Sequence, residues 1–157
     1  MSNYGTRYWY RSPLFWEIFF IDWVTKLAAR GMFRKPVIII NQFLSFEYQI
    51  NTGVAWSFLK PHSLVTYYLL TAVIFVVLGL LSKHTLDMQK SGYDVTGQTL
   101  ILAGGYANFV DRLIHYGVID FIKISFGNWT FPVFNIADIA ITVGAVIMLY
   151  QIFFEHD

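Results

Sequence analysis

Residues 64–81 read LVTYYLLTAVIFVVLGLL, a run of eighteen residues without a charged side chain. A helix needs about 20 mostly apolar residues to cross the hydrocarbon layer of a bilayer, so this stretch predicts a membrane-spanning helix. The whole chain agrees, because 56% of its 157 residues are hydrophobic and only 13% are charged. A soluble domain has about 25% charged residues. We therefore expect an integral membrane protein that forms one compact domain.

Three further segments are apolar enough to extend this prediction. Residues 136–154 have Asp138 as their one charge, and residues 97–114 combine apolar and small side chains before a polar cluster. Residues 13–32 are the least obvious span, because they include four charged side chains. We predict an all-α membrane protein with four transmembrane helices, at about 13–32, 64–81, 97–114 and 136–154, and we take the first as a retained span rather than a cleaved signal peptide.

The charges of the first span follow a helical pattern. Asp22, Lys26 and Arg30 are each four residues apart, so they lie on one face of a helix, with the acid in the favourable position before the lysine. Charged groups are costly in hydrocarbon. We expect this face to turn toward the helix bundle or a wet cavity.

Two long connections have a different composition from the spans. Residues 37–60 are rich in Ile, Phe and Tyr and contain NTG, which indicates short strands and a turn. Residues 116–135 have a similar aromatic and β-branched character. With four spans, both connections lie on one side of the membrane, but the Lys and Arg counts of the two sides are too similar to give the orientation.

Several kinds of chemistry are disfavoured by the residues present. The chain has no cysteine, which excludes disulfides and thiol catalysis, and its four histidines are scattered. We therefore expect no metal and no cofactor, and the net charge of +1 gives no sign of a nucleic-acid partner. A serine–lysine dyad of Ser57 and Lys60 is disfavoured, because Lys60 precedes Pro61 in a polar connection and is more simply a solvated charge.

The carboxylates are the strongest chemical signal. Asp120 follows the third span and Asp138 opens the fourth, so both reach the same membrane face. Two neighbouring carboxylates rarely ionise together, so one can act as an acid and the other as a base on a single water. Two alternatives remain open for this pair: an ion-coupled transport site, and a charge at Asp138 that only stabilises the start of its helix. For Asp111, a structural polar cluster with Asn108 and Arg112 is favoured over catalysis.

Five stretches stand out in order between about Asp22 and Met148: DWVTK (22–26), NTGVAWSF (51–58), NFVDR (108–112), VIDF (118–121) and FPVFNIADIAITVG (131–144). In this order they resemble the lipoprotein signal peptidase (signal peptidase II) family. The resemblance implies an intramembrane aspartyl endopeptidase that removes the signal peptide from diacylglyceryl-modified prolipoproteins, cutting just before the lipidated cysteine. An inactive relative that serves in binding or assembly is a further alternative, which the intact acid pair disfavours.

The resemblance also assigns residues and a topology. It implies that Asp120 and Asp138 are catalytic, and that the following residues bind substrate or support the site: Asp22, Lys26, Asn51, Gly53, Asn108, Asp111, Arg112 and Asn135. It implies a small periplasmic β-sheet cradle at about 37–60, both termini in the cytoplasm, residence in the bacterial inner membrane and inhibition by globomycin. We also expect a monomer.

Three positions differ from residues that are common in that family. Trp56 stands where phenylalanine is frequent, Ala107 where glycine is frequent, and Ile139 where serine is frequent. None of these differences removes a carboxylate. We expect them to affect substrate preference and the shape of the pocket rather than the reaction.

Overall fold

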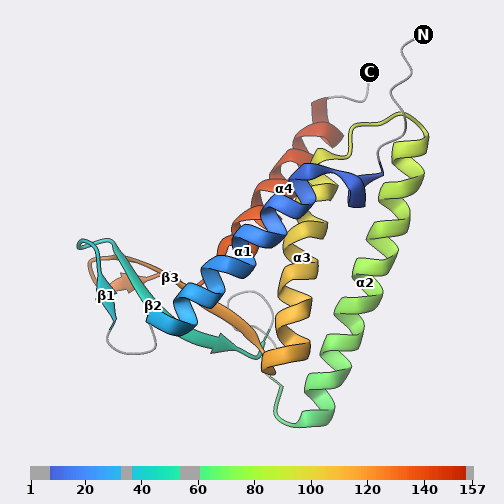
Figure 1. Cartoon of the computed structure of the whole chain (residues 1–157). Helices are drawn as coiled ribbons and strands as arrows, with labels where there is room; N and C mark the ends of the chain where they lie inside the picture. The colour runs from blue at the N-terminus through green and yellow to red at the C-terminus, as the bar shows by residue number, and fades with distance from the viewer. Residues whose placement is uncertain (1–7, 33–36, 54–60, 155–157) are drawn as a thin grey trace.

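The computed structural model describes residues 8–32, 37–53 and 61–154. Within these residues the chain forms four long helices and a small antiparallel sheet at one end of the bundle (Figure 1). The helices are α1 (Pro13–Met32), α2 (Leu64–Lys90), α3 (Thr96–His115) and α4 (Ile136–Phe154). A short 3-10 turn, Trp9–Arg11, precedes α1. The predicted contributions of Trp56, Ser57 and Lys60 lie outside the described residues.

Helix α3 is the centre of the bundle and contacts each of the other three helices. Half of its 20 residues are buried, and several of these are small, such as Gly97, Ala103 and Gly104. Small side chains allow helix backbones to approach closely, which is the usual source of helix association in a bilayer. Gly97 and Gly104 thus provide the surface on which α4 packs, since added Cβ atoms there would meet Gly144 and Ala137.

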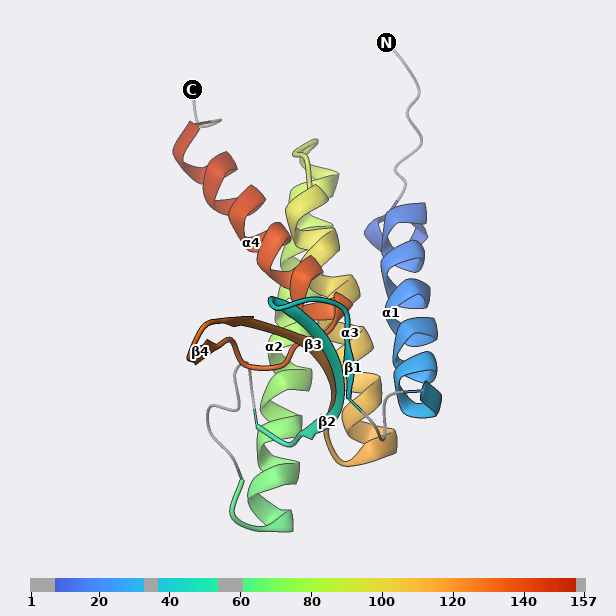
Figure 2. The same ribbon diagram turned by 90° about the vertical axis from the view of Figure 1, so that its left-hand side faces the viewer.

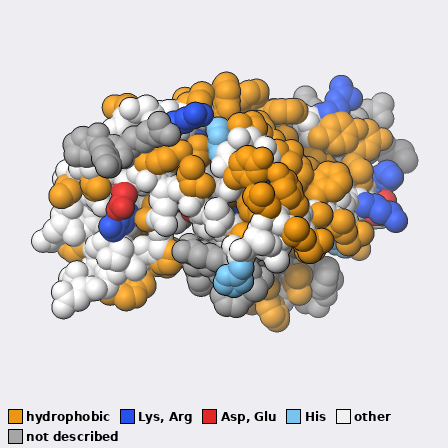
Figure 3. Space-filling model, turned by 90° about the horizontal axis from the view of Figure 1, so that it is seen from below, with side chains coloured by type: hydrophobic (Ala, Val, Ile, Leu, Met, Phe, Trp, Pro, Cys, Tyr) orange, Lys and Arg blue, Asp and Glu red, His pale blue; other side chains and the backbone are white. Residues whose placement is uncertain are grey.

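Helix α2 presents most of its apolar side chains outward. Only four of its 27 residues are buried, while Leu64, Val65 and Leu69 are all more than 60% exposed. Hydrophobic side chains also dominate much of the surface seen from below (Figure 3). Exposed apolar surface of this extent is unfavourable in water, so this surface is suited to contact with lipid.

Two of the four helices, α2 and α4, are long and apolar enough by length and composition to cross a membrane. Helices α1 and α3 have 20 residues each, but their charged and amide side chains make them less apolar. The prediction of four helices is confirmed for the described residues. Of these four, α2 and α4 meet the hydropathy criterion for a membrane span. Helix α2 also continues to Lys90, beyond its predicted end at residue 81, because the polar residues after 81 end the apolar run without interrupting the helix.

The predicted charged face of α1 is buried over only part of its length. Asp22 and Lys26 are 1% and 2% exposed, but Arg30 is exposed. A four-residue step on an α-helix exceeds one turn of 3.6 residues, so Arg30 has rotated away from the face that contains Asp22. The expectation that all three charges face the bundle was therefore wrong for Arg30.

The sheet draws on both long connections. Its strands are β1 (Ile38–Ile39), β2 (Leu44–Asn51), β3 (Val118–Phe126) and β4 (Trp129–Thr130), in the order β1-β2-β3-β4 with antiparallel neighbours. Figure 2 shows β2 and β3 curving together across the bundle. The cradle predicted at 37–60 is thus only part of the sheet, because β3 and β4 come from the second connection.

A short β-bridge places the start of α4 beside β3. Ile122 pairs with Phe134 in antiparallel orientation, and the Phe134 carbonyl accepts hydrogen bonds from the backbone N–H groups of Phe121 and Ile122. Asn135 follows directly and α4 begins at Ile136. The middle of β3 and the first turn of α4 therefore lie next to each other, which is where both candidate acids are found.

The close packing of α3 and α4 gives the first prediction. A Cβ atom added at Gly144 would lie 2.5 Å from the Gly97 carbonyl oxygen and 3.0 Å from the Ile101 backbone nitrogen. We expect Gly144→Ala to lower the free energy of unfolding by about 1–3 kcal/mol, because the two backbones must move apart. Unfolding in detergent micelles, followed by circular dichroism, measures this change.

Gly79→Ala is the matched control. Gly79 is also a helical glycine, but nothing lies within 4 Å of a Cβ atom added there. We expect this variant to be as stable as the parent or more stable by up to about 1 kcal/mol, because alanine favours the helix over glycine. Equal stability of the two variants would contradict the packing argument.

Candidate active site

Asp120 is a buried acid in the middle of β3. Its side chain is 2% exposed, and the strand pairing sets its backbone opposite Gln49 of β2. Oδ2 accepts a hydrogen bond of 3.1 Å from Asn51 Nδ2, and Oδ1 accepts one of 2.7 Å from Asn135 Nδ2. Two amide groups therefore hold this carboxyl group in place.

Asp138 is the third residue of α4 and takes part in a reciprocal cap. Its backbone N–H donates to Asn135 Oδ1 at 2.9 Å, while the Asn135 backbone N–H donates to Asp138 Oδ2 at 3.2 Å. This exchange is the capping-box pattern, in which an N-cap residue and the third helical residue satisfy each other. Asp138 Oδ1 accepts a further hydrogen bond of 2.9 Å from Asn108 Nδ2.

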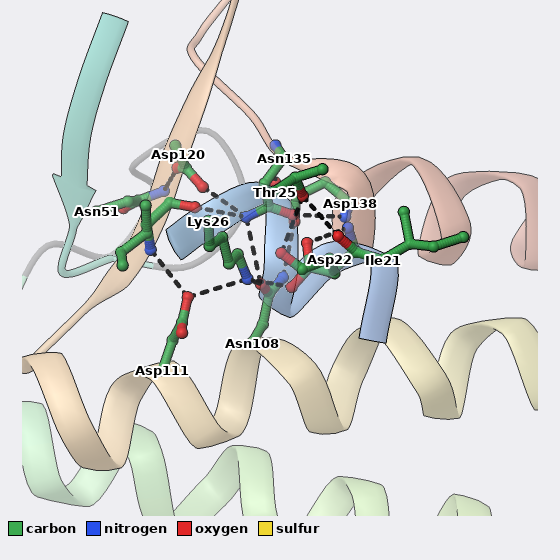
Figure 4. Close-up of polar contacts among 12 residues, drawn as sticks. Ile21, Asp22, Thr25, Lys26, Asn51, Asn108, Asp111, Asp120, Asn135 and Asp138 are labelled. Atoms are coloured by element: carbon green, nitrogen blue, oxygen red, sulfur yellow. Dashed lines mark hydrogen bonds and ion pairs between the residues drawn. The ribbon is translucent and has the colours of Figure 1, made fainter. Parts of the chain in front are cut away.

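Asn135 joins the two acids directly (Figure 4). Its side-chain nitrogen donates to Asp120, and its side-chain oxygen caps the helix that begins with Asp138. The same nitrogen lies 3.2 Å from Asn108 Oδ1 and from the Ile119 carbonyl oxygen. Asn135 is fully buried, so the position of one acid relative to the other depends on a single rigid amide.

A buried ammonium group lies beneath this pair. Lys26 Nζ is 2.6 Å from Asp22 Oδ2 and 2.9 Å from Asp111 Oδ2, and it donates to Asn108 Oδ1 at 2.8 Å. All three of its hydrogens thus have acceptors. The donation to Asn108 Oδ1 turns the other side of that amide, Nδ2, toward Asp138.

Asp22 and Asp111 each connect Lys26 to another backbone. Asp22 Oδ1 accepts from the Ala137 backbone N–H at 2.8 Å, which satisfies an otherwise unpaired donor in the first turn of α4. Asp111 Oδ2 accepts from the Ile119 backbone N–H at 3.1 Å. These two acids fix the positions of α4 and β3, and the contacts of Asp111 are those of a structural group.

Arg112 holds the end of β2. Its guanidinium donates to the Thr52 carbonyl oxygen at 3.3 Å and makes a short hydrogen bond to the Gly53 carbonyl oxygen. The Gly53 N–H in turn donates to Asn51 Oδ1 at 3.0 Å. This leaves Asn51 Nδ2 directed at Asp120. Arg112 therefore acts on Asp120 through the turn that follows β2.

Both acids line one cavity of about 280 Å³. The polar part of its wall includes Asn51, Asn108 and Arg112, together with the two carboxylates. The remaining wall is mainly apolar and comes from α2, α3, α4 and the segment before α4, with contributions from Ile74, Phe109, Val133, Phe134 and Ile141. The cavity is thus polar at the acids and apolar along the helices.

Burial, and to a lesser extent the neighbouring Asp138 carboxylate, raise the pKa of the Asp120 carboxyl group to about 7. The hydrogen bonds from Asn51 and Asn135 oppose this rise because they favour the ionised form. Near neutral pH Asp120 is therefore only partly ionised, so this member of the pair with Asp138 can give or accept a proton. Such a pair can direct a water at a carbonyl carbon or transfer protons.

The sequence brought out most of these residues but missed several contacts. One connected network contains the two acids and eight further predicted residues: Asp22, Lys26, Asn51, Gly53, Asn108, Asp111, Arg112 and Asn135. The pattern Asn135-x-x-Asp138 is a capping signal that could have identified the bridging role of Asn135. The hydrogen bond from Tyr67 Oη to the Arg112 carbonyl, at 2.8 Å, has no comparable signal.

Two of the positions noted for their sequence differences can be placed. Ile139 is 42% exposed on α4, and Ala107 is 6% exposed within α3. Neither is among the described residues that line the cavity of the two acids. The structure therefore shows no direct contact with this cavity that would support the expected influence of Ile139 and Ala107 on substrate preference.

The chain matches a family model described as signal peptidase (SPase) II over residues 14–154. It is 36% identical over 155 residues to a lipoprotein signal peptidase of Histophilus somni strain 2336, with 92% of this chain and 91% of that protein covered. It is 32% identical over 137 residues to a lipoprotein signal peptidase of Listeria monocytogenes serotype 4a strain HCC23, with 86% and 87% covered.

The fold also has solved counterparts. A bacterial membrane enzyme determined by the in meso method at 2.3 Å superposes with a TM-score of 0.66 and 28% sequence identity, over 91% of this chain and 88% of that chain. A second, determined by the same method at 1.9 Å, gives a TM-score of 0.65 and 26% identity, over 88% of each chain. The likeness extends over almost the whole chain.

The buried ammonium gives the second prediction. We expect Lys26→Met to lower the free energy of unfolding by about 3–5 kcal/mol, because Asp22 and Asp111 would remain buried beside each other without a cation. Unfolding in detergent micelles measures the loss.

Lys123→Met is the matched control. The Lys123 Nζ to Glu47 Oε2 distance is also 2.8 Å, but both side chains are about one-third exposed. Solvent weakens such a pair, so we expect a change of about 0–1 kcal/mol. If the two variants lost stability equally, burial would not explain the role of Lys26.

Proposed function

The chain belongs to the signal peptidase II family, and on that basis we propose that it is an aspartyl endopeptidase that removes the signal peptide from diacylglyceryl-modified prolipoproteins. In this proposal the enzyme cuts just before the lipidated cysteine. Asp120 and Asp138 are its catalytic residues. The observation that supports this assignment most is that one buried amide, Asn135, contacts both acids at a single cavity.

The proposed reaction uses one water. The ionised member of the pair takes a proton from the water as the oxygen attacks the scissile carbonyl carbon. The protonated member gives its proton to the carbonyl oxygen, which forms a tetrahedral diol. The carboxyl group that took the proton from the water then gives it to the leaving amine as the C–N bond breaks, and the other carboxylate takes a proton back from a diol hydroxyl as the new carboxyl group forms. Because the two acids interact, they titrate as a unit, and the base role belongs to the pair rather than to one named residue.

The cavity suits a substrate that is part peptide and part lipid. Its polar wall has amide and guanidinium donors beside the acids, whereas its apolar wall follows α2, α3 and α4. A lipidated peptide can place its scissile bond at the acids while its acyl chains remain among the lipids. The amides of Asn51, Asn108 and Asn135 hold the carboxylates. In this proposal they therefore support the acids, and binding the substrate is not their only role.

The membrane topology is part of the same proposal. All four helices span the bilayer, since α1 and α3 turn buried charges such as Asp22, Lys26 and Asp111 toward each other and away from lipid. The sheet and the acids lie on the periplasmic side of the bacterial inner membrane, and both termini lie in the cytoplasm. The enzyme acts as a monomer and is inhibited by globomycin.

The third prediction tests the acids. We expect Asp120→Asn and Asp138→Asn to fold and insert but to cleave a diacylglyceryl-modified prolipoprotein at least about 10²-fold more slowly, because the amide cannot exchange the proton. A gel-shift assay with purified enzyme measures the cleavage. Asn keeps one acceptor oxygen at each position, so one of the two hydrogen bonds that each acid accepts is retained.

Asp87→Asn is the control for this assay. Asp87 lies on the distal part of α2, where its carboxylate is exposed and 3.7 Å from Lys90. We expect full cleavage by this variant, and we expect globomycin to block cleavage by both it and the parent. Normal cleavage of the prolipoprotein by either active-site variant would contradict the assignment of Asp120 and Asp138 as the catalytic pair.

The fourth prediction concerns pH. The pKa of Asp120 is raised to about 7, so the pair holds its proton below this pH and loses it above. We expect kcat/KM to fall by about tenfold per pH unit above pH 7, because the doubly ionised pair has no acid. Tryptophan fluorescence over the same range should stay constant. A rate that continues to rise to pH 9 would show that the retained proton is not needed.

A further inference from the structure

A second cavity lies at the end of the bundle remote from the sheet. It has a volume of about 360 Å³ and is bordered by the last turns of α2, the first turn of α3, the connection between them and the last turns of α4. In Figure 1 these segments are at the top of the molecule, whereas the sheet is at the bottom left. The size is within the range of small-ligand sites, and neither Asp120 nor Asp138 lines it.

A buried amide at this cavity has an unused acceptor. Gln98 lines the cavity and is 3% exposed, yet its Oε1 accepts no hydrogen bond from any described residue. Within the described part of the chain, its Nε2 donates to one weak acceptor, Met88 Sδ at 3.5 Å. An unpaired buried acceptor is destabilising. Met88 is flexible and also lines the cavity, so a change of its rotamer can open the amide to a ligand that donates hydrogen bonds.

Asp94, the one carboxyl side chain of the described lining, is also an acceptor. Asp94 Oδ1 accepts from the backbone N–H and the hydroxyl of Thr96, and Oδ2 accepts from Gln151 Nε2 at 3.0 Å. A carboxylate has about four lone-pair sites, so Oδ2 can accept one more hydrogen bond. No lysine or arginine is among the described lining residues. The cavity therefore favours a cationic group with N–H donors.

The opposite wall is apolar and continues onto the outer surface of the bundle. Met148 and Ile152 line the cavity, and Ile152 is 52% exposed next to the outward-facing Leu149 and Phe153 of α4. This apolar surface belongs to the last turns of α4, one of the two helices suited to cross a membrane. A ligand with a hydrocarbon chain can thus extend from the cavity along α4, which a small soluble amine cannot do.

We propose that this cavity binds the headgroup of a phospholipid with a primary ammonium group, such as phosphatidylethanolamine. The ammonium donates hydrogen bonds to Asp94 Oδ2 and to Gln98 Oε1, and an acyl chain follows Met148 and Ile152. His84 also lines the cavity and supplies an imidazole N–H for the phosphate. The site is a lipid site that is separate from the acids and does not depend on the peptidase reaction.

The proposal distinguishes between lipid headgroups. Phosphatidylcholine has a quaternary ammonium with the same charge but no N–H, so it cannot satisfy Gln98 Oε1. Phosphatidylglycerol lacks the cation and is repelled by the Asp94 carboxylate. With matched acyl chains, we expect phosphatidylethanolamine to bind at least about tenfold more tightly than either, a difference of about 1.4 kcal/mol.

Native mass spectrometry of the full chain in detergent, titrated with each lipid, gives the dissociation constants. Asp94→Asn removes the charge but keeps a carbonyl oxygen that can accept from Thr96, so the start of α3 is preserved. We expect this variant to weaken phosphatidylethanolamine binding by about tenfold or more and to abolish the preference over phosphatidylcholine. Gln98→Leu, which removes the unpaired acceptor, should give the same loss without loss of thermal stability.

Two controls separate this site from other effects. Asp87→Asn removes a carboxylate from the same end of α2 but outside the cavity lining, and it should bind as the parent does. Asp138→Asn should also bind normally, since the acids are not involved, so failure of the lipid site and failure of the peptidase assignment are distinguishable. Equal binding of the three lipids, or unchanged selectivity in both Asp94→Asn and Gln98→Leu, would overturn the proposal.

Discussion

The ammonium group of Lys26 is buried between two carboxylates, and most of the site is positioned through it. Asp22 connects this cation to the backbone of α4, and Asp111 connects it to the backbone of β3. The third hydrogen bond, to Asn108, orients the amide that contacts Asp138. A single charge on α1 therefore determines where α3, α4 and β3 meet, although α1 itself contributes no acid to the candidate pair.

Burying such a charged network costs free energy, and the groups that surround the network explain how this cost is offset. Charged groups in a low-dielectric region are tolerated only when they are paired and fully hydrogen-bonded. Each oxygen of Asp22, and Oδ2 of Asp111, has a specific donor, and those donors include backbone N–H groups that would otherwise be unpaired at the start of α4 and β3. The network thus replaces water both for its own charges and for the ends of the surrounding elements.

The sequence predicts the four helices and the common location of Asp120 and Asp138, because both signals are local. Apolar runs and the spacing of Asp22 and Lys26 are visible within one segment, and the chain order alone places Asp120 and Asp138 at the same end of the bundle. The sheet is different, because β2 pairs with β3 at residues that are 67 (Asn51 and Val118) to 80 (Leu44 and Ile124) positions apart in the chain, and no local pattern specifies their register. Asn51 meets Asp120 only through that pairing, so its contact could not be derived from spacing.

Two other differences between the prediction and the structure also arise from the way the elements are arranged in space. The end of α2 could not be found from hydropathy, since Thr85 lies beyond the apolar run yet is fully buried and donates within the helix to the Leu81 carbonyl. The exposure of Arg30 follows from helix geometry, which a rule of four-residue spacing approximates only over short distances. Local patterns thus identify which residues form an element, whereas the neighbouring elements determine where it ends and which side is buried.

Asn135 shows why helix position and acid geometry are inseparable in this fold. As the N-cap of α4 it must keep its oxygen on the Asp138 N–H, which leaves its nitrogen to bind Asp120. A shift of α4 by even one residue would both break the cap and move the two acids apart. The same amide that begins α4 thereby sets the position of one carboxyl group relative to the other, so the stability of the helix start and the geometry of the pair depend on one side chain.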